Sequence, residues 1–256
     1  MKLLLAGDTH GSTYHMNNVF AHACRVEADV IFQLGDFGFG WSASVAGVDD
    51  FTHDVSQLTE RTGVPCYWLP GNHEGYWALA ALLARLEPEA DGTFQTAPGV
   101  FYVPRGTMLE WDGIRFLCCG GATSVDRDYR KPGESWWPEE MLTEEDVQKC
   151  IAATKENPAD VLLSHDFPFE ITVVDRHLAP HWGERAQADT IASRQRVSRI
   201  LDASGARYAY HGHLHLKYDE SMKTISGRDV EVHGLDCDGT PMSTSTLLLD
   251  TETLRD

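Results

Sequence analysis

The chain has few basic residues and no long apolar run, and each absence excludes a class of function. Lys and Arg number 21 against 39 Asp and Glu in 256 residues, giving a formal net charge of −18. Such a chain repels the polyanionic backbone of DNA and RNA, so we predict no standalone binding to duplex nucleic acid. Its apolar runs are far shorter than the roughly 20 residues that a membrane-spanning helix needs. The apolar residues 1–6 run directly into Gly7-Asp8, which predicts a first strand rather than a secretion signal.

The sequence also lacks a CxxC pair, an internal repeat and a low-complexity tract. Its six cysteines include the adjacent pair Cys118-Cys119, which lies in a strand-like run and is poorly placed for a disulfide framework. We therefore predict reduced thiols and a cytoplasmic protein. Hydrophobic residues make up 42% and charged residues 23%, an ordinary globular balance. Because no segment has the composition of an interdomain linker, we predict a single domain over residues 1–256.

Strand-like and helical segments alternate along the chain, which predicts an α/β fold. The first strands are expected at 2–7, 30–35 and 66–69, and helices at 14–26, 50–61 and 76–86. Strands at 100–103, 107–111 and 114–119 follow, with Asp112-Gly113 as a hairpin turn. Later helices are expected at 143–154 and 190–203, and strands at 160–164, 207–210, 217–224, 229–235 and 244–249. Residues 168–187, rich in aromatics, Pro and His, are predicted to form an irregular lid or interface insert.

Polar clusters follow the apolar strands at the point where each strand ends. Ligands of open α/β sheets bind beyond the carboxyl ends of the strands, so these clusters are expected to meet. Carboxylate and imidazole groups without sulfur favour Mn²⁺, Fe or Zn²⁺, and a shared carboxylate suits two metals about 3.5–4 Å apart. The clusters are Asp8-Thr9-His10, Gly35-Asp36, Gly71-Asn72-His73-Glu74, Ser164-His165 and Gly212-His213-Leu214-His215.

This ordered series, D-x-H, G-D, G-N-H-E, H and G-H-x-H, resembles the signature of calcineurin-like metallophosphoesterases. The resemblance covers the chain from Asp8 to His215, with every motif position filled. It implies a four-layer α/β/β/α sandwich of two mixed β-sheets flanked by helices, with a dinuclear metal site at the loop ends of the strands. One metal would be bound by Asp8, His10, Asp36 and His215, and the second by Asp36 as the bridge together with Asn72, His165 and His213.

The resemblance also implies catalytic roles. His73 would protonate the leaving-group oxygen, with Glu74 orienting it, while Asp36 bridges the metals during in-line attack of metal-bound hydroxide. Mn²⁺ is the expected metal, with Fe, Zn or Ni as alternatives. His10 resembles a position associated with diesterase activity.

The residues between the motifs narrow the substrate class. Asp36 is followed by Phe37-Gly38-Phe39-Gly40-Trp41 rather than by the Arg-Gly pattern of Ser/Thr protein phosphatases and symmetric dinucleoside tetraphosphatases. The loop containing Arg127, Arg130 and Trp136-Trp137 resembles bacterial and phage-encoded members, which act mostly on phosphodiesters or small nucleotides. We therefore expect a phosphodiesterase acting on a small phosphodiester such as a cyclic nucleotide. The alternatives are a phosphomonoesterase or nucleotide pyrophosphatase, a nuclease subunit that works with a partner, and a non-catalytic scaffold of the same fold.

Several side chains have two interpretations. Asn72, Arg127 and Arg130 could bind the substrate phosphate, with Asp126 orienting one arginine, or the arginines could pair with acidic residues and hold their loop. The aromatic residues of the loops could stack on a base, pack in the core or support a homodimer. They are Phe37, Phe39, Trp41, Trp136 and Trp137. In the insert, His177, His181 and Trp182 could reach the substrate.

Overall fold

The computed structural model describes residues 1–40, 50–173 and 183–255. Trp41, His177, His181 and Trp182, which were considered for substrate contacts, lie outside the described residues.

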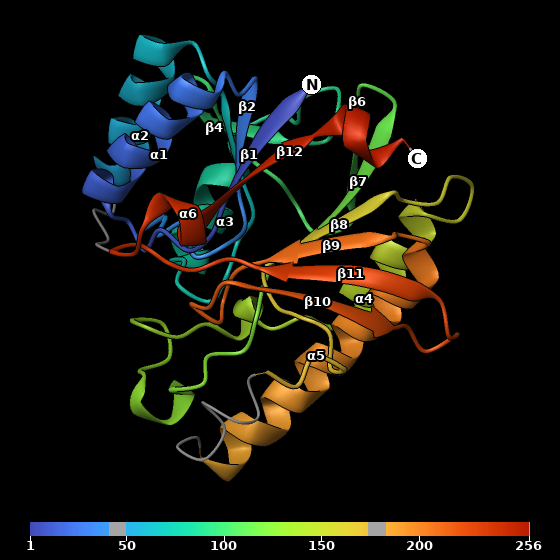
Figure 1. The fold of residues 1–256 in the computed structure, drawn as a ribbon. Coiled ribbons are helices and arrows are strands. Elements are labelled where there is room, and N and C mark those ends of the chain that lie inside the picture. Colours follow the sequence, from blue (N-terminus) through green and yellow to red (C-terminus); the bar gives the residue numbers. More distant parts are fainter. Residues whose placement is uncertain (41–49, 174–182, 256) are drawn as a thin grey trace.

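The first sheet is built mainly from the N-terminal part of the chain (Figure 1). Its central strands are parallel, and the two edge strands, β12 and β4, are antiparallel to their neighbours. The order is β12 (Thr246–Asp250), β1 (Lys2–Ala6), β2 (Val30–Gln33), β3 (Cys66–Trp68), β5 (Val100–Tyr102) and β4 (Phe94–Ala97).

The second sheet has the same plan, with parallel strands in the centre and antiparallel strands at both edges. Asp112 and Gly113, between β6 and β7, have positive φ angles of 54° and 77°, as the tight hairpin turn requires. The order is β10 (Tyr218–Lys223), β11 (Asp229–Gly234), β9 (Tyr208–His211), β8 (Val161–Ser164), β7 (Ile114–Cys119) and β6 (Thr107–Trp111).

The two sheets pack face to face, and helices cover both outer faces (Figure 1). Side chains alternate across β1, so that Leu3 and Leu5 lie between the sheets while Leu4 and Ala6 face the helices. The helices on the first sheet are α1 (Thr13–Val26), α2 (Asp50–Thr62) and α3 (Tyr76–Leu83), and those on the second are α4 (Glu144–Ala153) and α5 (Glu184–Ser204). Short elements are α6 (Met242–Ser245) and the 3-10 helices η1 (Arg127–Tyr129), η2 (Pro138–Glu140) and η4 (Thr251–Leu254). The predicted α/β/β/α sandwich is confirmed.

Several elements differ from the sequence prediction: α3 ends at Leu83 rather than at residue 86, and residues 244–245, expected in a strand, belong to α6. Strand β4 was not predicted, because it is a short edge strand whose register shifts between Gln95 and Ala97. Helix α5 begins at Glu184 rather than Thr190, so residues 184–187 are helical and not irregular. Residues 174–182 lie outside the described residues, so whether the insert forms a lid or an interface stays a prediction.

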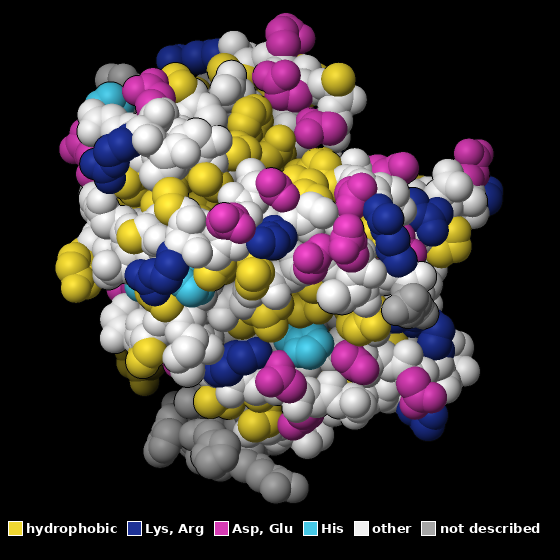
Figure 2. Space-filling model, turned by 45° about the horizontal axis from the view of Figure 1, so that its top comes forward, with side chains coloured by type: hydrophobic (Ala, Val, Ile, Leu, Met, Phe, Trp, Pro, Cys, Tyr) yellow, Lys and Arg dark blue, Asp and Glu magenta, His cyan; other side chains and the backbone are white. Residues whose placement is uncertain are grey.

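The surface agrees with the acidic composition. On the face drawn in Figure 2, acidic side chains are interspersed with Lys and Arg, and the described residues form no continuous basic stripe there. Among the described helices, none is long and apolar enough to cross a membrane.

Candidate metal centre

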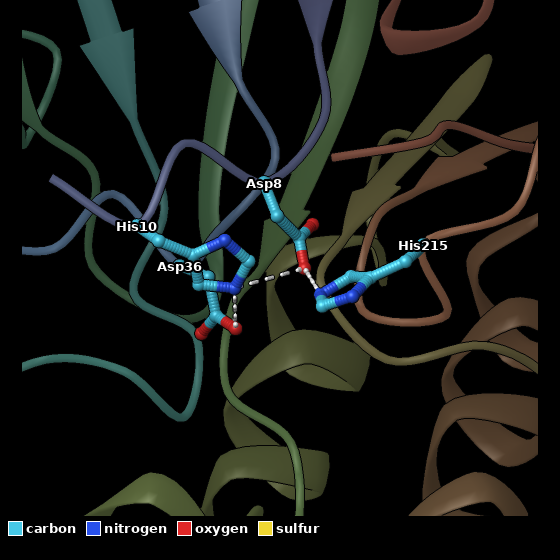
Figure 3. A group of neighbouring side chains, drawn as sticks. All are labelled: Asp8, His10, Asp36 and His215. Atoms are coloured by element: carbon cyan, nitrogen blue, oxygen red, sulfur yellow. Dashed lines mark ion pairs between the residues drawn. The ribbon is translucent and has the colours of Figure 1, made fainter. Parts of the chain in front are cut away.

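The loops after five parallel strands bring carboxylate and imidazole groups together. Two sets of side chains have ligand atoms within 4.8 Å of one another and could each hold a metal ion. The first set is Asp8, His10, Asp36 and His215, drawn in Figure 3, and the second is Asp36, His165 and His213. Asp36 belongs to both sets, which is the arrangement that a bridging carboxylate requires.

Asp8 shows that the first set fits a cation. Its Oδ1 accepts the N–H of His213 at 2.9 Å. Its Oδ2 lies 3.1 Å from Nε2 of His215 and 3.9 Å from Nε2 of His10. This oxygen is buried and has no hydrogen-bond partner among the described residues. A buried carboxylate oxygen without a hydrogen bond, facing two imidazole nitrogens, is suited to share a metal ion with them.

Both carboxylate oxygens of Asp36 are directed at other groups. Oδ1 accepts the N–H groups of Asn72 at 2.6 Å and His73 at 2.8 Å, and it lies 3.2 Å from Nε2 of His165. Oδ2 lies 3.4 Å from Nε2 of His10. Burial opposes the charged form, but His165 and His73 hold the pKa of Asp36 well below its usual range. Asp36 is therefore an anion at neutral pH.

Two of the imidazoles, those of His165 and His10, are held by a hydrogen bond at Nδ1, so that each presents Nε2 to the cluster. Nδ1 of His165 donates to the carbonyl oxygen of Leu34 at 2.8 Å, which leaves Nε2 facing Asp36 and, at 3.2 Å, Oδ1 of Asn72. Burial opposes protonation, but the Asp36 and Asp8 carboxylates raise the pKa of His165 to about 10 and that of His10 to about 9. Metal binding must therefore displace protons from these rings.

Asp238, which the sequence analysis did not identify, holds His10 in the same way. Its Oδ1 lies 2.7 Å from Nδ1 of His10. We expect Asp238→Ala to lower metal affinity by about 10- to 100-fold, because residues behind a ligand typically contribute that much. The measurement is a calorimetric metal titration. Asp219→Ala is the matched control, since Asp219 pairs with Nδ1 of His233 at 2.6 Å outside both metal sets. Equal affinity in the two variants would contradict this role for Asp238.

The backbone at the cluster is strained. Six non-glycine residues of the described chain have positive φ, and four of them are His10 (43°), Asp36 (54°), His213 (68°) and His215 (51°). Such conformations cost about 1–3 kcal/mol each and concentrate at functional sites. Close approach also requires glycine, since a Cβ on Gly71 would overlap Oδ1 of Asp36.

His73 lies beside the cluster but belongs to neither metal set. Its Nε2 is 2.8 Å from Nη2 of Arg130, and because a guanidinium can only donate, Nε2 accepts this hydrogen bond. Burial lowers the pKa of His73, Asp36 acts in the opposite direction, and Arg130 lowers it further. The side chain is 25% exposed, so a ligand can reach the ring.

Glu74 contacts the backbone of the loop. Its carboxylate is fully buried and accepts the N–H groups of Gly71 at 2.7 Å and Gly38 at 3.2 Å. Burial and the charge of Asp36 raise the pKa of Glu74 to about 8. These contacts fix the loop that carries Asn72 and His73. The orientation of the His73 ring by Glu74 stays a prediction.

The two arginines of the 126–141 loop have different surroundings. Arg130 reaches the cluster, where it contacts His73 and donates to the carbonyl oxygen of Asn72 at 3.1 Å. Arg127 instead pairs with Asp189 at 2.6 Å and lies over the ring of Trp136 at 4.0 Å. Its contacts match the loop-holding interpretation.

The aromatic side chains proposed for base stacking are packed instead. The exposed fractions of Phe37, Phe39, Trp136 and Trp137 are 0%, 1%, 7% and 6%. Phe37 and Phe39 both stack on Trp68. For these four residues the packing interpretation is confirmed.

The fold and the family are also shown by comparison with known proteins. TT1561 of Thermus thermophilus has a similar structure, with a TM-score of 0.56 at 14% sequence identity over 99% of this chain and 96% of that one. A dimetal phosphatase from Danio rerio aligns with a TM-score of 0.57 at 14% identity, covering 97% of this chain and 91% of that one. No curated protein matches the sequence significantly. The sequence model of calcineurin-like phosphoesterases matches residues 1–217. With this match and an intact His/Asp ligand cluster, the chain belongs to the calcineurin-like phosphoesterases, a family of metal-dependent phosphoester hydrolases.

Proposed function

We propose that the protein is a dinuclear metal-dependent phosphodiesterase that hydrolyses a small phosphodiester, such as a cyclic nucleotide. The observation that carries this proposal is Asp36, whose carboxylate belongs to two adjoining sets of ligand atoms. We assign Asp8, His10, Asp36 and His215 to one metal, and Asp36, Asn72, His165 and His213 to the other. Mn²⁺ suits these oxygen and nitrogen donors, with Fe, Zn or Ni as alternatives. Two divalent cations would offset the local carboxylates and bring the pKa of a bound water towards about 7.

Two residues of the site are assigned to phosphoryl binding and to protonation of the leaving group. We also assign Asn72 to hold a phosphoryl oxygen; its side chain contacts His165 and Ser124. His73 supplies the proton for the leaving-group oxygen. Since Nε2 of His73 accepts a hydrogen bond from Arg130, it carries no proton in this arrangement. It would have to release Arg130 and take up a proton from solvent before it could protonate the leaving-group oxygen.

The diesterase assignment is favoured over the alternatives by the ligand set. His10 occupies the position that resembles one associated with diesterase activity, and Asp238 fixes its ring. A non-catalytic scaffold has no need for strained backbone at four ligand positions. We also propose a cytoplasmic location, which agrees with six free cysteines. A homodimer stays a prediction.

The test compares bis-p-nitrophenyl phosphate with p-nitrophenyl phosphate, using purified protein reconstituted with Mn²⁺. We expect faster hydrolysis of the diester and no turnover after chelation. Preference for the monoester would indicate a phosphomonoesterase or nucleotidase. No hydrolysis of either substrate by a protein with two metals bound would contradict the proposal and favour a non-catalytic scaffold.

A further inference from the structure

Arg130 is built into the site from a separate loop. Its Nε pairs with Asp126 at 2.7 Å, Nη1 donates to the carbonyl oxygen of Asn72 at 3.1 Å, and Nη2 donates to Nε2 of His73 at 2.8 Å. The side chain is only 8% exposed. A fixed, nearly buried guanidinium therefore lies directly beside the proposed proton donor.

The position of Nη2 determines which part of a substrate Arg130 can meet. The leaving-group oxygen must come within about 3 Å of Nε2 of His73 to receive its proton. That oxygen then lies within roughly 6 Å of Nη2, the sum of two hydrogen-bond lengths. Arg130 therefore faces the leaving group, whereas the ligand cluster faces the phosphoryl group that is attacked.

Proton transfer also changes the hydrogen bonding of Arg130. Where a leaving-group oxygen takes the place of Nη2 at Nε2 of His73, the hydrogen bond that Nη2 donates there is lost. Losing a hydrogen bond is costly for a charged group with so little solvent exposure. A phosphate oxygen is a strong acceptor for a guanidinium, because its hydrogen bond is charge-assisted.

We propose that Arg130 recognises a second phosphate carried by the leaving group, so that the preferred substrate is a short phosphodiester such as a phosphorylated dinucleotide. The inference rests on the proposed function and deepens it. In a cyclic mononucleotide the leaving oxygen carries no second phosphate. In pApA the leaving sugar carries one when its 3′ oxygen leaves, and in ApAp it carries one when its 5′ oxygen leaves. Arg130 is thereby a specificity-determining residue, and Asp126 holds it in place.

Two exposed rings flank the same loop and suit the nucleoside that such a leaving group carries. Tyr129, directly before Arg130, is 92% exposed, and Trp77 at the start of α3 is 59% exposed. The ring of Trp77 lies against Gly133, where an added Cβ would be 2.6 Å from Cη2. Aromatic side chains at such positions stack on bases without regard to sequence.

The test uses the dinucleotide ApA with its phosphorylated forms pApA and ApAp, in the wild type, Arg130→Ala and Arg130→Lys. We expect the wild type to prefer a phosphorylated form by about 10- to 100-fold in kcat/KM, the range of one charge-assisted hydrogen bond. Arg130→Ala should abolish the preference, mainly through KM, and Arg130→Lys should retain part of it. Arg199→Ala is the matched control, because it removes one arginine from an exposed pair with Glu144 at 2.7 Å. Metal content and thermal melting check that each variant is folded and loaded.

The outcomes separate this inference from the proposed function. If the wild type hydrolyses bis-p-nitrophenyl phosphate but shows no preference among the dinucleotides, the inference is overturned and the proposed function survives. Equal losses on all three dinucleotides in Arg130→Ala would overturn it as well, by showing that Arg130 only holds its loop. If no diester is hydrolysed, the proposed function fails, and calorimetric binding of adenosine 5′-phosphate against adenosine decides on Arg130. Unchanged phosphate binding in Arg130→Ala would then overturn the inference.

Discussion

Asp36→Asn is expected to lose both metal ions and, with them, at least about 99% of turnover. The variant keeps an oxygen that can accept the N–H groups of Asn72 and His73, so the loop should stay in place. It loses the negative charge and the second carboxylate oxygen, which lies 3.4 Å from Nε2 of His10. Because Asp36 belongs to both ligand sets, we expect metal affinity to fall by more than the roughly 10- to 100-fold typical of residues behind the ligands.

Metal content measured by elemental analysis, together with diester turnover, checks this result. Asp160→Asn is a suitable control, since its carboxylate accepts the N–H of Arg115 at 2.8 Å and lies outside both ligand sets. An Asp36→Asn protein that still binds two metals and turns over substrate would rule out a bridging role.

His73→Ala is expected to show the opposite combination, with full metal content and turnover reduced by about 10²- to 10⁴-fold, the contribution of a general acid. The ring lies outside both ligand sets, so its removal should leave the metals bound. The loss should depend on the leaving group. The alkoxide that leaves from a dinucleotide is a strong base and needs a proton. The p-nitrophenolate ion is a weak base and can leave without being protonated.

The loss in His73→Ala should therefore be smaller on bis-p-nitrophenyl phosphate than on ApA. His53→Ala provides the control, because His53 is exposed on α2 and contacts Gln57. Undiminished turnover of ApA by His73→Ala would remove His73 from the mechanism.

The candidate ligand residues were predictable because five of the central strands, β1, β2, β3, β8 and β9, are apolar runs that are each followed by a polar motif. The limits of these strands follow from burial on both faces, and the motifs follow at the same edge of the two sheets. The four-layer arrangement, in contrast, required the family resemblance. Alternation of strands and helices does not tell which of the later strands return to the first sheet, as β12 does.

The residues behind the ligands were not predictable in the same way. Asp238 follows β11 in the run Leu235-Asp236-Cys237-Asp238, which has no motif, and only the folded chain brings it to His10. The one sequence feature that could have identified Asp238 is its place as an acidic residue just beyond the end of a strand. Glu140 lies in an acidic run, yet it is buried and accepts hydrogen bonds from Ser124 and Trp136. Burial of a single carboxylate depends on tertiary contacts that composition does not encode.

The pairing of β12 with β1 affects how the protein is made. Leu3 pairs with Leu249, and the amino group of Met1 donates to Thr251 at 2.8 Å, so the beginning of the chain is completed by residues synthesised about 245 positions later. Until β12 has left the ribosome, β1 is an apolar edge strand with unpaired backbone groups, the kind of surface that recruits other chains. Aggregation during synthesis, rather than loss of the finished enzyme, is therefore the expected consequence of slow translation of the segment that contains β12.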